Sequence, residues 1–522
     1  MKSKSRFFAF MVVLATAMPS LGQEDRLGRV SFPTSCDPKV QAQFERAVAM
    51  LHSFWYSAGE KLFREVLAQD PSCAIATWGI ASLLMSNPLA GAGSSPKGAA
   101  QAQAAIDEGR KIRAKTERER DYIEAVAAYY EDWANRFERD RQHSRAKAYE
   151  ALAARYPDDD EAQIFYALYL AATQSQAEQT YATYLKSASI LEKQFTKHPA
   201  HPGVAHYLIH SYDAPPIAEK GLTAARRYAS IAPAAPHALH MPSHIFTRVG
   251  AWEDSAATNR RSADTAKQGN DKDEQMHALD YMAYAYLQVA RDNDARLVME
   301  EASQVSGFSR SSGPYAFAAI PARYTIERGD WSAAMKLKLT TNNLHYTEAV
   351  TRFARGLGAA RSGDSALAQA EVEHLARLRD ALKGKDEYWA TEVEVSRLGA
   401  SAWAALALGK KDEALKLMRS AAEIEGKNEK HIVTPGRIVP ARELLGQMLL
   451  ELKRPAEALK EFEASQIREP NRFHGFAGAA RAAAESGNSA KAKQYYTRLI
   501  ELTRKGDSRR EVEQAKVFLA QP

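Results

Sequence analysis

Apolar residues recur at steps of three and four along almost the whole chain, and this spacing constrains the fold more than any other feature. Such steps place side chains on one face of an α-helix. The alternation of apolar and polar residues that is typical of half-buried strands is scarce. The sequence therefore predicts an all-α protein. Because a single closed helical core would be unusually large for 522 residues, we expect an array of internal repeats.

One repeat is visible near the carboxyl end, where the pair Leu445-Gly446 is followed by Ala458, Phe462 and Pro470. These offsets resemble those of the tetratricopeptide repeat, a helix-turn-helix unit of about 34 residues. Similar patterns occur in residues 56–71, 250–252, 329–334, 363–368, 409–414 and 480–496. The resemblance covers roughly residues 37–505 and implies a right-handed α-solenoid of tetratricopeptide-like repeats, in which small and aromatic residues let paired helices approach closely.

Residues 1–22 have the pattern of a signal peptide. Three basic residues precede an apolar run from Phe7 to Met18, and Ser20 and Gly22 suit a cleavage site. The run is short for a membrane span, and no later stretch is long enough. We therefore expect an exported protein, periplasmic or extracellular, with an N-terminal extension over 23–36, the solenoid over 37–505 and a helical tail over 506–522.

The net charge indicates which binding partners to expect, and the two cysteines indicate whether a disulfide can form. Removal of the signal leaves 67 Lys and Arg against 64 Asp and Glu, since three of the 70 basic residues lie in it. This balance gives no indication of nucleic-acid binding. Both cysteines, Cys36 and Cys73, follow the signal, and an oxidising compartment would allow them to form a disulfide. The alternative is that both are small buried apolar residues.

Histidines are concentrated in one part of the chain. Eight of the fourteen lie between His198 and His277. His206 and His210 are four residues apart, as are His240 and His244, so each pair shares one face of a helix. Pro242 lies inside the second pair and is expected to bend that helix or to start a new one.

In tetratricopeptide solenoids the second, fifth and ninth positions of each first helix line the concave groove. The resemblance assigns such positions to His206, His210, His237, His240, His244, His277, Asp280 and Tyr284. First helices of successive repeats stack 8–10 Å apart, so imidazoles from neighbouring helices can meet around one ion. Neutral histidine binds zinc, copper, iron and nickel, and carboxylates can complete such a site.

The predicted metal ligands are His206, His210, His237, His240, His244, His277, Asp213 and Asp280. This set exceeds the four ligands usual for one zinc ion, so two ions are conceivable. The alternative is that these histidines are packing or capping residues, because pairs four apart also arise by chance in helical proteins.

Two segments carry a narrower resemblance: HPGVAHYLIHSYD at 201–213 and APHALHMPSHIF at 235–246. They are similar to segments of a group of exported bacterial tetratricopeptide proteins. The resemblance implies membership of that group and no particular reaction.

Two functions remain open from the sequence. In the first, the groove binds a peptide or partner protein, and the histidines supply hydrogen bonds or pH sensitivity. In the second, the groove holds one or two transition-metal ions, zinc, copper or iron. A catalytic metal would activate water or dioxygen, with Asp213, Asp280 or Tyr284 assisting proton movement. The sequence does not decide whether the protein is an enzyme.

Overall fold

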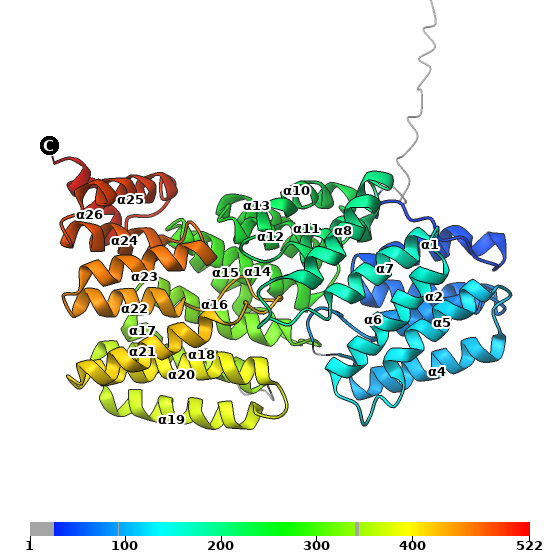
Figure 1. Ribbon diagram of the computed structural model, residues 1–522, viewed down its shortest axis with the longest axis horizontal. Helices are drawn as coiled ribbons and strands as arrows, with labels where there is room; N and C mark the ends of the chain where they lie inside the picture. Colours follow the sequence, from blue (N-terminus) through cyan, green and yellow to red (C-terminus); the bar gives the residue numbers. More distant parts are fainter. Residues whose placement is uncertain (1–25, 92, 340–343, 522) are drawn as a thin grey trace, which may run out of the picture.

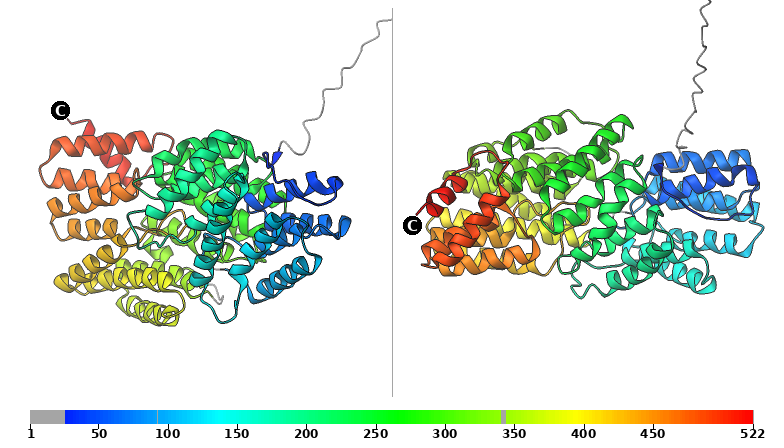
Figure 2. Two further views of the ribbon diagram at one scale, coloured as in Figure 1. Left: turned by 45° about the vertical axis from the view of Figure 1, so that its right-hand side comes forward. Right: turned by 90° about the horizontal axis from the view of Figure 1, so that it is seen from above.

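The computed structural model describes residues 26–91, 93–339 and 344–521. These residues form helices and connecting loops and contain no β-strand, so the all-α prediction is confirmed. Figures 1 and 2 show an elongated array of stacked helices with the N-terminal helices at one end and the C-terminal helices at the other. The predicted signal peptide lies outside the described residues. No helix in the described ranges has the length and apolar character needed to cross a bilayer.

The first half of the chain forms α1 (Pro38–His52), α2 (Tyr56–Gln69), α3 (Ile75–Leu84), α4 (Pro96–Ile112), α5 (Glu117–Tyr130), α6 (Glu138–Arg155), α7 (Asp160–Ala171), α8 (Ala182–Lys197), α9 (Pro202–Ser211), the 3₁₀ turn η2 (Ala218–Gly221), α10 (Leu222–Ile231), α11 (Pro236–His240), α12 (Pro242–Arg248) and α13 (Trp252–Gln268). The second half forms α14 (Lys272–Gln288), α15 (Asp292–Ser303), α16 (Ser312–Glu327), α17 (Trp331–Ala334), α18 (His345–Ser362), α19 (Ser365–Leu382), α20 (Glu387–Ala407), α21 (Lys411–Gly426), α22 (Ala441–Glu451), α23 (Pro455–Arg468), α24 (Phe473–Glu485), α25 (Ser489–Leu502) and α26 (Arg510–Leu519).

Consecutive helices pack as pairs, and alternate helices stack along the array, as in the series α14, α16, α18, α20, α22 and α24. Small residues permit close approach between them. A Cβ atom added to Gly446 in α22 would lie 2.7 Å from the ring of Phe462 in α23, and Gly478 in α24 meets the same ring. The glycine and the aromatic residue of the sequence pattern therefore form one tight contact, as expected for helical repeats.

The connection between α21 and α22, residues 427–440, crosses the middle of the molecule (Figure 1). Its Ile432 belongs to the hydrophobic core of the N-terminal half. Its Lys430 is buried and pairs with Asp213, 3.4 Å from Nζ to Oδ2. We call this segment the central strap. It packs against the helices that carry the predicted site, since Tyr281 of α14 donates to its Thr434 carbonyl.

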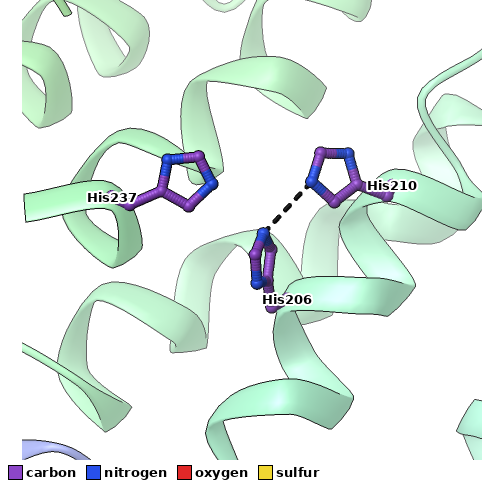
Figure 3. Close-up of side chains that lie close together, drawn as sticks. All are labelled: His206, His210 and His237. Carbon is purple, nitrogen blue, oxygen red and sulfur yellow. Dashed lines mark hydrogen bonds between the residues drawn. The ribbon is translucent and has the colours of Figure 1, made fainter. Parts of the chain in front are cut away.

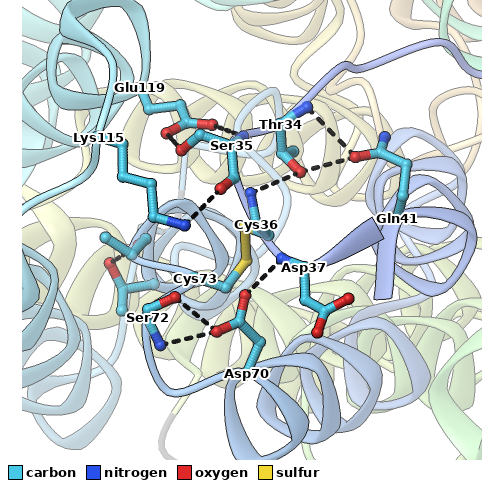
Figure 4. The surroundings of a disulfide bond; sticks show 12 residues. Thr34, Ser35, Cys36, Asp37, Gln41, Asp70, Ser72, Cys73, Lys115 and Glu119 are labelled. Carbon is cyan, nitrogen blue, oxygen red and sulfur yellow. Dashed lines mark hydrogen bonds between the residues drawn. A yellow bond between two sulfur atoms is a disulfide. The ribbon is translucent and has the colours of Figure 1, made fainter. Parts of the chain in front are cut away.

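The two cysteines form a disulfide that ties the segment before α1 to the turn after α2 (Figure 4). Asp70 reinforces this junction, since its carboxylate accepts hydrogen bonds from the backbone N–H groups of Asp37 at 2.7 Å and Ser72 at 3.0 Å. Glu119 accepts from the backbone N–H of Ser35 at 2.5 Å. The segment directly before α1 is thus fixed to the first helical pairs.

Candidate metal centre

The six predicted histidines lie together in the centre of the molecule, on α9, α11, α12 and α14. Each has at most 8% of its surface exposed. The helix expected around Pro242 is broken as the sequence suggested. α11 ends at His240 and α12 starts at Pro242, and the break still leaves His240 and His244 facing each other. The histidines form a buried cluster, and His237 and His277 border a cleft on one side of it.

The first triad comprises His206, His210 and His237, whose nearest ring nitrogens all lie within 4.8 Å of one another. Figure 3 shows the three rings converging from two helices. The Nε2 atoms of His206 and His210 are 3.1 Å apart. His206 Nδ1 donates to the backbone carbonyl of His52 at 2.7 Å, and His237 Nδ1 lies 3.0 Å from Glu274 Oε1. Two buried ring nitrogens, His210 Nδ1 and His237 Nε2, have no hydrogen-bond partner.

The second triad comprises His240, His244 and His277, again within 4.8 Å of one another. His240 Nδ1 lies 2.7 Å from Asn259 Oδ1, and His244 Nδ1 lies 2.8 Å from Asp213 Oδ2. The Nε2 atoms of His240 and His244 are 3.0 Å apart.

Proton positions in the second triad follow from these partners. Asn259 Nδ2 donates to the Ser255 carbonyl at 2.7 Å, so its Oδ1 faces His240 and can only accept. The Asp213 carboxylate also accepts. The Nδ1 atoms of His240 and His244 therefore carry the proton. In neutral rings the two Nε2 atoms then have a lone pair and no proton. Two lone pairs facing each other at 3.0 Å repel unless a cation lies between them.

The cluster favours neutral imidazoles. Burial lowers the pKa of His206, His210, His237, His240 and His277 well below the usual value. Burial also lowers the pKa of His244, although Asp213 opposes the effect. Neutral imidazole is the form that binds a metal ion.

The two triads are adjacent. The ring centroids of His210 and His244 are 5.4 Å apart, and those of His237 and His240 are 5.8 Å apart. Tyr281 packs against the second triad, with its ring centroid 4.7 Å from that of His240, and its hydroxyl donates to the Thr434 carbonyl of the central strap at 3.0 Å. The strap thus closes one side of the cluster.

The two predicted acidic ligands occupy different positions. Asp213 lies beside the cluster and holds His244, while its other oxygen accepts from Arg248 Nε at 2.7 Å. Burial opposes ionisation of Asp213, but Lys430 and Arg248 keep its pKa below the usual value. Asp280 does not contact the histidines and instead forms an ion pair with Arg323, with 3.0 Å between Oδ1 and Nε. The structure therefore makes Asp213 a hydrogen-bond partner of His244, and it does not bring Asp280 to the cluster.

Tyr284, which the repeat alignment placed in the groove, also lies away from the histidines. Its hydroxyl contacts Glu469 at 3.1 Å and Arg472. The alignment assumed that all first helices present the same positions to one groove. In the structure α14 contacts both α11 and α24, so successive turns of this helix face different neighbours.

A third buried group, His52, Glu161 and His201, provides an instructive contrast. His201 Nδ1 accepts from the Val204 backbone N–H, so its Nε2 carries the proton and donates to Glu161 Oε1 at 2.8 Å. His52 Nε2 lies 2.9 Å from Glu161 Oε2, and its Nδ1 lies 2.9 Å from the Tyr207 hydroxyl. Every ring nitrogen has a compatible partner, and no bare lone pairs face each other. This group is a complete hydrogen-bond network.

Apart from Asp213, sequence reasoning missed the residues around the histidines that orient them directly or through Asp213. Glu274 lies one turn before His277 on α14, a spacing that offered a signal. Asn259, Lys430 and the His52 carbonyl come from distant segments, and no local pattern marks them.

A cleft of ≈ 760 Å³ reaches the cluster from outside, and His237, His277 and Glu274 form part of its lining. Tyr56, Arg310 and Val433 also line this cleft, which we call the entry cleft. In comparisons with known proteins, no family model and no curated protein matches the chain.

Proposed function

We propose that this protein is a metalloprotein whose six histidines bind two transition-metal ions, one in each triad. The facing Nε2 lone pairs of His240 and His244 carry the proposal, because a bound cation removes their repulsion. With metal–nitrogen bonds of about 2.0–2.1 Å, nitrogens separated by 3.0 Å subtend an angle of roughly 95° at the ion, which is acceptable for several transition metals.

The hydrogen bonds around the triads support the same proposal. Histidine ligands usually donate the second ring N–H to a carboxylate or a backbone carbonyl, which fixes the tautomer. His206, His240 and His244 have such acceptors in the His52 carbonyl, Asn259 and Asp213. The corresponding Nε2 atoms are left free to bind metal.

The donor set narrows the choice of metal. Six imidazole nitrogens suit copper, zinc, iron or nickel, whereas calcium and magnesium require oxygen ligands. Three protein ligands per ion leave coordination positions for exogenous molecules, as in catalytic metal sites. A bound ion of this kind supplies Lewis acidity or, for copper and iron, electron transfer to a small ligand.

The alternative function, in which the groove binds a peptide or partner protein, has less support. A peptide-binding groove needs an accessible inner surface. Here His206 and His240 have 0% exposure, and the central strap occupies the middle of the molecule. We keep the tetratricopeptide kinship, the right-handed winding and the export to the periplasm or exterior as proposals that rest on the sequence patterns.

Elemental analysis of tag-free protein tests the proposed function. We expect two transition-metal ions per chain in the parent protein and fewer than one in the double variant His206→Ala with His240→Ala. His201→Ala is the matched control, since it also removes a buried imidazole and is expected to retain both ions. Metal-free parent protein that also fails to take up zinc, copper, iron or nickel after dialysis would refute the proposal.

A further inference from the structure

The entry cleft connects the histidine cluster to the protein surface and is bordered by one histidine of each triad. His237 belongs to the first triad and His277 to the second, and both line the cleft. His237 Nε2 is buried and has no hydrogen-bond partner. A molecule in the cleft would therefore contact one histidine of each triad.

Charge balance determines which molecules such a centre attracts. Six neutral imidazoles add no negative charge to two divalent ions. Asp213 is already shared with the buried cations of Arg248 and Lys430. Glu274 is the other carboxylate that touches a ligand, at 3.0 Å from His237. The loaded centre thus carries excess positive charge in a buried setting, and an anionic ligand would offset it.

Arg310 supplies a second anchor for an anion. It lies on the loop before α16, and its Nη2 donates to Asp271 at 2.5 Å. Among the described residues its Nε and Nη1 atoms make no hydrogen bond, and its side chain retains 27% exposure. Either free nitrogen of this charged guanidinium can donate a charge-assisted hydrogen bond to a carboxylate. Four acidic residues line the cleft, namely Glu60, Asp271, Asp273 and Glu274, and Lys97 and Lys272 line it as well. With Arg310 the lining has four acidic against three basic side chains, so it offsets only a small part of the positive charge of two divalent ions.

Apolar and aromatic side chains complete the lining. Trp55, Tyr56, Leu83 and Val433 lie in the cleft, and the Arg310 guanidinium lies 5.9 Å from the centroid of the Tyr56 ring. The buried Tyr56 hydroxyl has no hydrogen-bond partner. A volume of ≈ 760 Å³ falls within the range of small-molecule sites, about 300–1,000 Å³.

From these observations we infer that the entry cleft binds a small organic carboxylate with an apolar or aromatic body, held by Arg310 and directed toward the two ions. This inference rests on the proposed function, because the ions provide the charge that the ligand offsets. It names the class of molecule that the proposed centre binds.

Protein loaded with cobalt(II) allows a direct test, because the visible spectrum of cobalt reports changes in its ligands. Benzoate serves as the anionic probe, and benzamide serves as a neutral probe of the same shape. Binding of both is followed by calorimetry and by the cobalt spectrum. The variants are Arg310→Gln, which removes the charge, and Arg310→Lys, which keeps it. Lys97→Gln is the control, since Lys97 lines the cleft without contacting the cluster.

We expect benzoate to change the cobalt spectrum and to bind at least ten-fold more tightly than benzamide. Arg310→Gln should weaken benzoate binding by ten-fold or more at unchanged cobalt content, whereas Arg310→Lys and Lys97→Gln should weaken it by less than three-fold. Equal affinities for the two probes, or parent-like benzoate binding by Arg310→Gln, overturn the inference while the metal centre stands. If Arg310→Gln fails to fold, the comparison of benzoate with benzamide in the parent protein decides alone. Failure of the parent protein to bind cobalt contradicts the proposed function itself.

Discussion

Replacement of Asp213 by Asn separates the role of this residue in the proposed metal centre from its role in stability. The Asp213 carboxylate lies 2.8 Å from His244 Nδ1, 2.7 Å from Arg248 Nε and 3.4 Å from Lys430 Nζ. All of these groups are buried. An amide has the same shape but no charge, so Arg248 and Lys430 lose their counter-ion.

Two magnitudes follow from this geometry. Removal of one partner from a buried ion pair typically costs about 3–5 kcal/mol, so we expect the free energy of unfolding to fall by about this amount. The carboxylate also fixes the tautomer of His244, and loss of such a partner lowers metal affinity by about 10–100-fold. Chemical denaturation measures the first effect, and competition with a chromogenic chelator measures the second.

Asp280→Asn is the matched control for this experiment. Asp280 is equally buried and pairs with the buried Arg323, but it touches no histidine of the cluster. We expect it to lower stability by a similar amount and to leave metal affinity within two-fold of the parent. If Asp213→Asn binds metal as tightly as Asp280→Asn, the argument that Asp213 orients a metal ligand is refuted.

Three further predictions concern stability. Because burial keeps the pKa of the cluster histidines below 6.5 in the folded state, the unfolded chain binds more protons below pH 6.5. The free energy of unfolding of metal-free protein should therefore fall as the pH drops from 6.5 to 5, by up to about 1.4 kcal/mol per pH unit for each histidine. Denaturation curves that do not depend on pH would contradict this prediction. Reduction of the Cys36–Cys73 disulfide, which closes a loop of sequence separation 37, should cost about 4 kcal/mol in denaturation experiments, and an unchanged midpoint counts against it. Gly446→Ala should lower the melting temperature, since the new Cβ atom would lie 2.7 Å from Phe462. Gly399→Ala is the control and should be neutral or stabilising, because its Cβ atom would have 3.5 Å of clearance. A lower melting temperature for Gly399→Ala than for Gly446→Ala would show that the helices are not tightly packed at Gly446.

Local sequence patterns predicted much of the fold. The spacing of apolar residues predicted the helices, and the pairing of Gly446 with Phe462 predicted close contact between α22 and α23. The central strap was not predictable in the same way. Its residues 427–440 have no helical spacing, and its contacts with Asp213 and Tyr281 join segments more than 150 residues apart in the chain.

The clustering of the histidines was predictable from the sequence, whereas the residues around the cluster were not. Pairs four apart on a helix placed His206 with His210 and His240 with His244, because helix geometry alone fixes that proximity. The meeting of both pairs required the packing of α9 against α12, which the repeat resemblance suggested. Asp280 shows where that resemblance misled: it shares a helix with His277, but α14 turns it toward Arg323.

Anomalous scattering from crystals of the zinc-loaded protein locates the bound ions. We predict two peaks, one within about 2.0–2.1 Å of the nearest nitrogens of His206, His210 and His237, and one similarly placed among His240, His244 and His277. A zinc-loaded crystal with no peak in either triad, or with its peak at His52, Glu161 and His201, would contradict the account.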